Sequence, residues 1–226
     1  MRVVVVRTYV EMRSPEEARL THSNIPGLSF GRAGPADIGA YRETFQDIGR
    51  EVLWVDRWDW NDEDFARQLG KSETVVWLVT LDGVPAGLIE GFLGDDGSVQ
   101  YTYVGVRPRF QGRGLGKLLL SHAIERSWEM KVKRIWLFTL TSDGEHALEN
   151  YLKRGFTISK RRAAILDIPE SLAPRIRERM EAARARGIAP GLLRRVEAHV
   201  RESAPGAAAT RIVWELRRAV RALRSG

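Results

Sequence analysis

Apolar and polar positions along the chain follow two different periods, and the changes between them mark out the elements. Residues 2–12 alternate and are rich in β-branched side chains, which predicts a strand. Three apolar runs follow one another over residues 74–81, 85–93 and 98–106. The turn Asp82-Gly83 separates the first two, and Asp-Gly between β-rich runs is a strong hairpin signal. The three runs therefore predict an antiparallel meander.

Helical spacing of apolar residues accounts for most of the remaining chain up to Arg154. A helix through Tyr41 and Ile48 is expected after Pro35, because proline is tolerated in a first helical turn. Asn61 is suited to cap a second helix that ends near Leu69. Two further helices are expected over 114–130 and 145–154, and short strands over 28–32, 134–141 and 156–160. This order of elements predicts an α+β domain.

The composition changes at about Pro169, where arginine, alanine, leucine and glutamate become dominant. Breaks at Pro190-Gly191 and Pro205-Gly206 divide this part into three expected short helices. The last, over 207–223, carries one apolar stripe: Ile212, Val213, Leu216, Val220 and Leu223. The stripe favours packing on the rest of the chain or a homodimer contact, with an acidic surface as the alternative partner. Nucleic acid is disfavoured, because no recognised module or aromatic interleaving accompanies the arginines.

Composition narrows the classes of protein. A chain of 226 residues accommodates one domain with an appendage, or two small domains. The net charge of +7 favours an anionic partner without choosing one. No cysteine is present, which excludes thiolate nucleophiles and thiolate metal sites and suits a cytoplasmic location. The four histidines form no pair at metal-ligand spacing, so no metal is expected. The apolar run after Arg2 is too short for a signal peptide or a membrane span.

The clearest chemical signal is a glycine-rich, basic turn that leads into the helix expected from residue 114. Gln111, Gly114 and Gly116 form the pattern Gln-x-x-Gly-x-Gly, with Arg113 and Lys117 beside them. Glycines let backbone amides approach an anion, and the helix dipole favours negative charge at the same place. The pattern is neither the dinucleotide fingerprint nor a P-loop. It predicts a phosphate site, and a plain structural turn is the alternative.

Two stretches carry a family resemblance. Residues 104–116, VGVRPRFQGRGLG, resemble the acyl-CoA-binding motif of the GNAT superfamily of N-acyltransferases. Residues 147–156, ALENYLKRGF, resemble its second motif, a helix that ends in Tyr-x-x-x-Gly-Phe. The resemblance covers roughly residues 28–160. It implies a GNAT-like α+β fold, with a mixed, mostly antiparallel sheet flanked by helices, an extra N-terminal strand and a C-terminal helical extension.

The domains expected on this basis are an N-terminal strand and linker over 1–27, an N-acyltransferase domain over 28–168, and an Arg-rich helical extension over 169–226. The resemblance also implies that acetyl-CoA is the acyl donor. Backbone amides of the glycine loop would hold its pyrophosphate, the Val104 amide would polarise the thioester carbonyl, and Val106 would pair with the pantetheine arm. The expected cofactor-binding residues are Val104, Val106, Gln111, Gly112, Arg113, Gly114, Leu115, Gly116, Lys117 and Asn150.

Acetyl transfer to an amine requires an acid and a base. Tyr151 resembles the general acid of the family, and packing of its helix on the sheet is the alternative role. Many members carry a glutamate six residues before the last valine of the strand, where this chain has Gln100, which cannot take a proton. Glu90 is the expected substitute. A three-residue hairpin loop would place it opposite Thr102, on the face of Gln100. A solvated or structurally paired glutamate is the alternative.

The acceptor is expected between the first two helices, a region that contributes to the acceptor pocket in this family. Residues 52–64 combine three tryptophans with five carboxylates. Aromatic faces and carboxylates suit a cationic amine, whereas core packing and helix capping are the ordinary alternatives. Trp54, Asp56, Trp58 and Gln100 are the expected acceptor residues.

The sequence therefore predicts a cytoplasmic N-acetyltransferase that moves an acetyl group from acetyl-CoA to a primary amine by direct attack in a ternary complex. A small cationic amine is the first choice of acceptor. A protein lysine or N-terminus is the second, and a charged tRNA the third. The alternative from another class is a non-catalytic acyl-CoA-sensing or interaction module, which the glutamine at position 100 favours.

Overall fold

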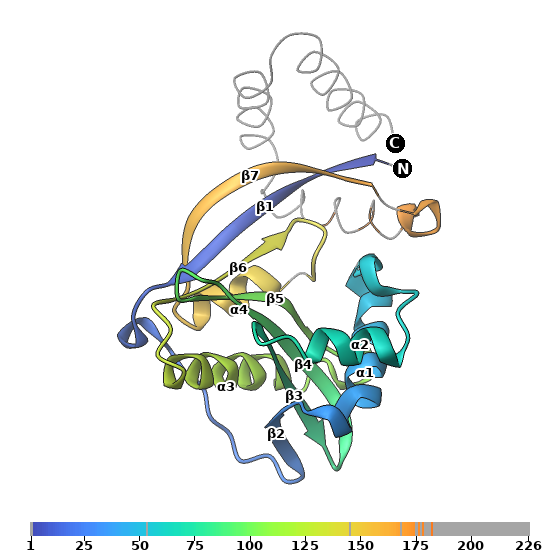
Figure 1. Ribbon diagram of the computed structural model, residues 1–226. Coiled ribbons are helices and arrows are strands. Elements are labelled where there is room, and N and C mark those ends of the chain that lie inside the picture. The colour runs from blue at the N-terminus through green and yellow to red at the C-terminus, as the bar shows by residue number, and fades with distance from the viewer. Residues whose placement is uncertain are drawn as a thin grey trace. The chain divides into compact units, whose positions relative to one another are not determined.

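The computed structural model describes residues 2–52, 54–144, 146–167 and 169–174, and the single positions 176, 178 and 182 (Figure 1). Most of the predicted C-terminal extension, including the apolar stripe over 207–223, lies outside the described residues. Within the described residues, no helix is both long enough and apolar enough to cross a membrane.

The described strands form one seven-stranded sheet in the order β2-β3-β4-β5-β6-β1-β7. The strands are β1 (Arg2–Met12), β2 (Leu28–Arg32), β3 (Thr74–Leu81), β4 (Val84–Leu93), β5 (Ser98–Val106), β6 (Arg134–Leu140) and β7 (Thr157–Asp167). The helices are α1 (Ile38–Val52), α2 (Asp62–Leu69), α3 (Leu115–Glu129) and α4 (Ala147–Lys153). Strands β2 to β5 are antiparallel neighbours, and β5 and β6 run parallel. The predicted α+β class with a mixed, mostly antiparallel sheet is confirmed.

The chain divides into two compact units. The larger comprises residues 9–138 and 146–159 and carries both motifs. The smaller comprises 1–8, 139–145 and 160–226. Within the smaller unit, the Thr141 amide donates to the Val6 carbonyl, and the Thr141 hydroxyl accepts from the Val6 amide, both at 3.1 Å. The domain boundaries expected at residues 27 and 168 stay a prediction.

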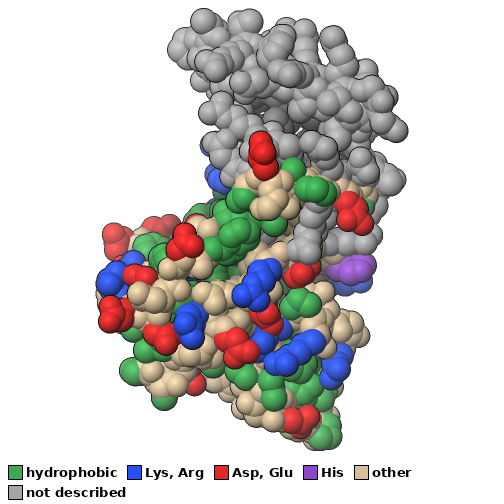
Figure 2. All heavy atoms as spheres, turned by 90° about the vertical axis from the view of Figure 1, so that its right-hand side faces the viewer, with side chains coloured by type: hydrophobic (Ala, Val, Ile, Leu, Met, Phe, Trp, Pro, Cys, Tyr) green, Lys and Arg blue, Asp and Glu red, His purple; other side chains and the backbone are tan. Residues whose placement is uncertain are grey.

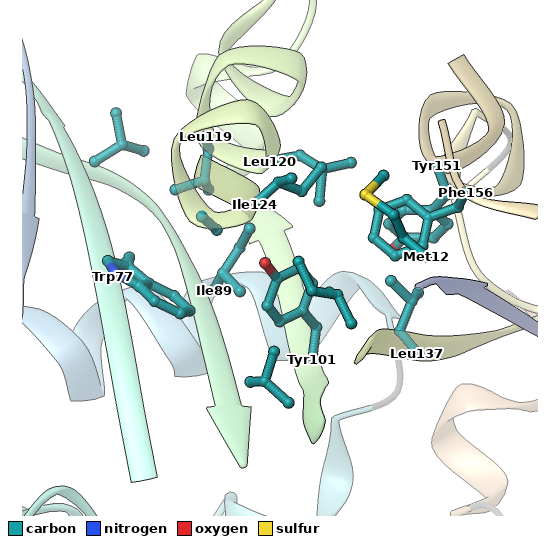
Figure 3. Close-up of a cluster of buried hydrophobic side chains, with 14 of the residues drawn as sticks. Met12, Trp77, Ile89, Tyr101, Leu119, Leu120, Ile124, Leu137, Tyr151 and Phe156 are labelled. Carbon is teal, nitrogen blue, oxygen red and sulfur yellow. The ribbon is translucent and has the colours of Figure 1, made fainter. Parts of the chain in front are cut away.

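The larger unit has a hydrophobic core on each face of its sheet. Side chains alternate along β3, so that Trp77 faces one core and Leu78 faces the other. Helix α3 contributes Leu119, Leu120 and Ile124 to the first core, where Trp77 and Tyr101 also lie (Figure 3). Helices α1 and α2 cover the second core, to which they contribute Tyr41, Phe45, Ile48 and Phe65.

A β-bulge in β5 determines which side chains reach the second core. Glu90 pairs with Tyr103, whereas the next residue, Gly91, pairs with Tyr101, so Thr102 is the additional residue. In a regular strand Tyr101 and Tyr103 would share a face. Here Tyr101 lies in the α3 core and Tyr103 packs against the α1–α2 core.

The bulge corrects the predicted position of Glu90. The three-residue loop forms as predicted, because the Gly94 amide donates to the Ser98 carbonyl at 2.8 Å, and Gly97 has the left-handed φ of 78°. That loop alone would set Glu90 opposite Thr102. The bulge shifts the register by one residue, so Glu90 lies opposite Tyr103 and points toward α1 and α2.

Strand β5 pairs with β6 only over Ser98–Gln100, opposite Arg134–Trp136. From Tyr101 to Val106, this edge of β5 has no strand partner among the described residues. Strands β5 and β6 therefore separate after Gln100. This separation leaves the edge containing Val104 available for a ligand.

Candidate active site

The glycine loop has the backbone geometry of an open anion site. Gly112 and Gly114 both have φ of 75°, a conformation that glycine adopts without strain. Gly114 is the N-cap of α3 and has no side chain to cap the helix, so the amides of the first turn are available to donate hydrogen bonds to a ligand. A Cβ added to Gly112 would meet nothing within 4 Å, so the loop is approachable from outside. These features fit the phosphates of an acyl-CoA.

The two motifs meet at Gly116, in the first turn of α3. A Cβ placed there would lie 3.7 Å from Val106 Cγ2 and 3.9 Å from Asn150 Nδ2. The end of β5, the start of α3 and helix α4 are therefore adjacent. The Gln111 side chain donates to the Val106 carbonyl at 3.1 Å and ties the loop to the strand. The structure thus brings together Val106, Gly116 and Asn150, whose contacts with the cofactor stay a prediction.

Positive charge surrounds the loop. The Arg109 and Arg113 guanidinium carbons lie 4.9 and 5.6 Å from the centre of the Phe110 ring. Both arginines and Lys117 are exposed. Phe110 is buried, so its ring is fixed and holds the two guanidinium groups where they can contact phosphate oxygens.

Tyr151 belongs to the core that α3 covers. Its side chain is 7% exposed, and its ring centre lies 6.2 Å from that of Phe156 (Figure 3). Gly155 ends the α4 segment with φ of 99°, and a Cβ there would lie 1.9 Å from the Glu17 carbonyl oxygen. This turn sets Phe156 against Tyr151 and restricts the tyrosine ring. Its role as the general acid stays a prediction.

Glu90 lies in a buried polar cluster. Arg57 donates to both of its carboxylate oxygens, at 2.7 and 2.9 Å, and Tyr41 donates its hydroxyl to one of them. Gln68 donates to the other at 3.1 Å. The side chains of Glu90 and Arg57 are 3% and 8% exposed. The carboxylate has donors on both oxygens and almost no contact with solvent.

Near the predicted acceptor residues, three aromatic rings form a cage around Arg57. Its guanidinium carbon lies 4.5, 4.6 and 5.1 Å from the ring centres of Trp60, Tyr103 and Phe45. Burial lowers the pKa of Arg57, but its hydrogen bonds to Glu90 and the charge of that carboxylate outweigh burial and raise the pKa overall. Burial, followed by the charge of Glu90, likewise raises the pKa of Tyr41. The cage is therefore filled by a permanently charged side chain of the chain itself.

The predicted acceptor residues differ in exposure. The Trp54 ring packs between Phe45 and Tyr103, with centres 5.1 and 5.0 Å away. The Trp58 indole N–H is buried, with no hydrogen-bond partner in the described part of the chain. Asp56 is 55% exposed and accepts a hydrogen bond from the Tyr103 hydroxyl. Among these three, Asp56 is the one that offers charge to a ligand.

Asp56 is held in place by buried neighbours. Burial, and then the hydrogen bond to Asp56, raise the pKa of Tyr103, so the phenol stays a donor to this carboxylate near neutral pH. The Asp56 carboxylate also lies 3.8 Å from the Arg57 guanidinium. Tyr103 directly precedes Val104 on the open edge of β5. An exposed carboxylate is thereby held by the side chain of the residue that precedes Val104.

Several residues of this site were not found from the sequence: Arg57, Tyr41, Tyr103 and Trp136. Arg57 lies within the tryptophan-rich segment over 52–64 that suggested a pocket for a cation. The same pattern also fits a buried arginine between aromatic rings, which was not predicted from the sequence. Gln100 lies opposite Phe92 on one side and Trp136 on the other. Strand pairing is needed to bring these three side chains together.

The net charge of the chain does not gather on the face that carries α1 and α2. Figure 2 shows basic and acidic side chains interspersed there. The pairs Arg42–Asp62 and Arg67–Asp64, at 3.0 and 3.1 Å, belong to these helices. This face therefore offers individual charges rather than a field of one sign.

A family model and several solved structures are similar to the part of the chain that contains the two motifs. The model of the acetyltransferase (GNAT) family matches residues 41–156. A GCN5-related N-acetyltransferase from Kribbella flavida superposes with a TM-score of 0.55 at 19% identity, over 76% of this chain and 62% of that one. Another from Sphaerobacter thermophilus gives 0.57 at 18%, over 72% and 50%. This chain thus spans between half and about three fifths of those two proteins. No curated protein matches it.

At such identities the solved structures show the fold alone. The family model covers more than half of the chain, and it includes the glycine loop, the open edge of β5 and the Tyr151 helix. The chain belongs to the acetyltransferase (GNAT) family.

Proposed function

We propose that the protein is an N-acetyltransferase that moves an acetyl group from acetyl-CoA to a primary amine by direct attack in a ternary complex. One observation carries the proposal. The open glycine turn at the start of α3, the unpaired edge of β5 and helix α4 meet around Gly116. The predicted phosphate site, a β5 edge without a strand partner among the described residues, and the helix of Tyr151 are thus adjacent.

The cofactor would be held mainly by backbone. The amides of residues 112–117 would bind its pyrophosphate, supported by Arg113 and Lys117. Bound acetyl-CoA supplies an activated thioester. The Val104 amide would donate to the carbonyl oxygen as it gains negative charge, an interaction that lowers the barrier by about 3 kcal/mol in comparable sites.

The proton balance follows from the bonds that change. The neutral amine nitrogen forms a bond to the acetyl carbon, and the carbon–sulfur bond breaks. An acceptor that binds as the ammonium would first lose a proton to water. Tyr151 would then give its proton to the departing thiolate. The nitrogen would release one proton to water, and the tyrosinate would regain a proton from water. The net products are an amide and CoA as the free thiol. No cysteine exists to form an acyl-enzyme, which agrees with direct attack.

We assign Glu90 the task of holding Arg57. Its two oxygens already accept hydrogen bonds from Arg57, Tyr41 and Gln68. No lone pair of the carboxylate is therefore left to accept a proton from the amine. The pair fixes the segment between α1 and α2 to β4. Asp56 lies next to Arg57 in that segment and would attract the ammonium form of the acceptor.

These features favour a small cationic amine. A protein lysine or N-terminus remains the second candidate, because it presents the same ammonium group. A non-catalytic acyl-CoA-sensing module is the alternative that Gln100 supports. It predicts cofactor binding without turnover.

The binding half of the proposal is tested at Gly116. Acetyl-CoA at about one hundred times its dissociation constant should raise the melting temperature of the wild type by roughly 5 °C or more, because a ligand of the folded state stabilises it. The Gly116→Leu variant should lose this shift, since its side chain fills the space beside Val106 and Asn150. Gly39→Leu is the matched control, since Gly39 is exposed on α1 and a Cβ there meets nothing within 4 Å. An unshifted wild type would contradict the proposal.

A further inference from the structure

Aromatic side chains lie on both sides of Gln100 along four neighbouring strands, β4, β5, β6 and β1. Gln100 on β5 pairs with Phe92 on β4 and with Trp136 on β6. The Tyr9 ring on β1 lies 6.4 Å from the Trp136 ring, with 22° between their planes. We define Phe92, Trp136 and Tyr9 as the aromatic row.

The members of the row and Gln100 point to one face of the sheet. Val99 and Tyr101 belong to the α3 core, so Gln100, which lies between them, points away from it. The same alternation applies to Trp136, between Ile135 and Leu137. A Cβ on Gly91 would meet core atoms of Val75 and Val99 at 3.0 Å, so the next residue, Phe92, also points away.

Helices α1 and α2 cover this face over β3, β4 and the C-terminal end of β5, where Tyr103 lies. Their core includes Val76, Leu78 and Leu88 and packs against Tyr103, but among the described residues it contains none from β1 or β6. Phe92 is 44% exposed, the largest fraction among the exposed large apolar side chains of the described residues. Gln100, Trp136 and Tyr9 are half-buried. The row thus begins where the cover of these two helices ends.

Polar contacts fix the Trp136 ring. Its indole N–H donates to the Ser98 hydroxyl at 3.3 Å, and the Arg134 guanidinium carbon lies 5.2 Å from the ring centre. Arg134 is itself paired with Glu11 at 2.8 Å, which offsets its charge. The row therefore offers a flat, preorganised apolar surface, and preorganised rings lose little entropy when a ligand stacks on them.

The row is continuous with the site of chemistry. Because Thr102 is the bulged residue, Gln100 and Tyr103 follow one another on the same face of β5. Tyr103 holds Asp56, and Val104 follows it on the open edge. An acceptor whose ammonium lies near Asp56 would extend its body past Gln100 onto the row.

We infer that Phe92 and Trp136 are specificity-determining residues of the acceptor site, and that the acceptor is a primary amine with a flat aromatic body. This inference rests on the proposed function and adds to it the chemical class of the substrate. Aromatic rings favour other rings in offset or edge-to-face geometry beyond the area they bury. An aliphatic chain of equal length would gain only the buried area.

The test compares phenethylamine and tryptamine with n-hexylamine, by release of CoA from acetyl-CoA. The wild type should have a KM for the aryl amines about tenfold below that for hexylamine. Phe92→Ala and Trp136→Ala should raise the aryl KM about tenfold, with kcat and the hexylamine KM little changed. Trp136→Phe, which keeps a flat ring, should restore part of the loss.

Three controls separate this effect from others. Val84→Ala truncates a side chain of β4 that is 38% exposed and lies outside the row, and should change neither KM. Asp56→Asn should raise both KM values together, because it removes charge rather than ring contact. A wild-type increase in melting temperature with acetyl-CoA shows that the fold of a variant is intact. If Trp136→Ala lacks this increase, Phe92→Ala still tests the inference, because Phe92 is 44% exposed and its removal disturbs little buried packing.

Equal KM values for aryl and alkyl amines in the wild type, or an unchanged aryl KM in Phe92→Ala, would overturn the inference while leaving the acetyltransferase proposal in place. Turnover restricted to lysine peptides would also overturn it. Absence of turnover with every amine would overturn the proposed function, and the inference with it.

Discussion

Glu90→Gln is expected to lower the free energy of unfolding by about 3–5 kcal/mol, since removing one partner of a buried ion pair leaves the other charge uncompensated. Arg57 would keep its charge inside a cage of Phe45, Trp60 and Tyr103. Its solvent exposure of 8% leaves little water to replace the lost carboxylate. Urea denaturation followed by tryptophan fluorescence measures the change.

Arg67→Met is the matched control for this loss. Arg67 forms an ion pair with Asp64 at 3.1 Å, but its side chain is 71% exposed, so the change in stability should stay within about 0.5 kcal/mol. The double variant Arg57→Met/Glu90→Leu should recover much of the stability, because an apolar replacement removes both buried charges. A loss in Glu90→Gln no larger than that of Arg67→Met would contradict the buried pair.

The Glu90→Gln variant also distinguishes a positioning role for Glu90 from the role of general base that the sequence suggested. If Glu90 holds Arg57, the pH dependence of kcat/KM in Glu90→Gln should keep the shape of the wild-type profile while its height falls. Loss of the limb in which a base is deprotonated would instead show that Glu90 takes the proton.

Tyr151→Phe is expected to lower kcat by about one hundredfold, because general acid catalysis of this kind contributes roughly two to four orders of magnitude. The phenyl ring preserves packing against Phe156, so the melting temperature and the KM for acetyl-CoA should change little. Steady-state kinetics at saturating amine measure the effect. A kcat equal to that of the wild type would remove Tyr151 as the acid.

Tyr101→Phe is the control for the loss of a buried hydroxyl. Tyr101 lies in the same core (Figure 3), and its hydroxyl bonds to that of Ser127 at 2.9 Å. This variant should lose about 1 kcal/mol of stability and keep its kcat. A similar fall in kcat in both variants would indicate a general packing defect.

The sequence predicted the elements well where a local pattern determines them. The Asp-Gly turn and alternating runs correspond to the meander β3–β5, and the glycine loop opens α3 within one residue of the predicted start. Both motifs depend on residues that are close in the chain. Their meeting at Gly116 joins segments that are distant in the chain, and periodicity does not predict it.

Features that depend on distant pairing were not predicted. The bulge at Thr102 changed the partner of Glu90, and no local signal in β5 marks it. The Glu90–Arg57 pair joins residues 33 positions apart. Trp136 reaches Gln100 only through the parallel pairing of β5 with β6. Spacing within one segment does not determine such contacts, so the pairing of Glu90 with Arg57 and the position of Trp136 beside Gln100 needed the structure.

Release of CoA from acetyl-CoA with a panel of amines, followed with a thiol reagent, tests directly whether the protein is an acetyltransferase. The chain has no cysteine, so the protein itself gives no background. We expect release that depends on the amine, with one acetyl group gained by the amine for each CoA formed. Acetyl-CoA that raises the melting temperature but releases no CoA with any amine would contradict an acetyltransferase and indicate a sensing module.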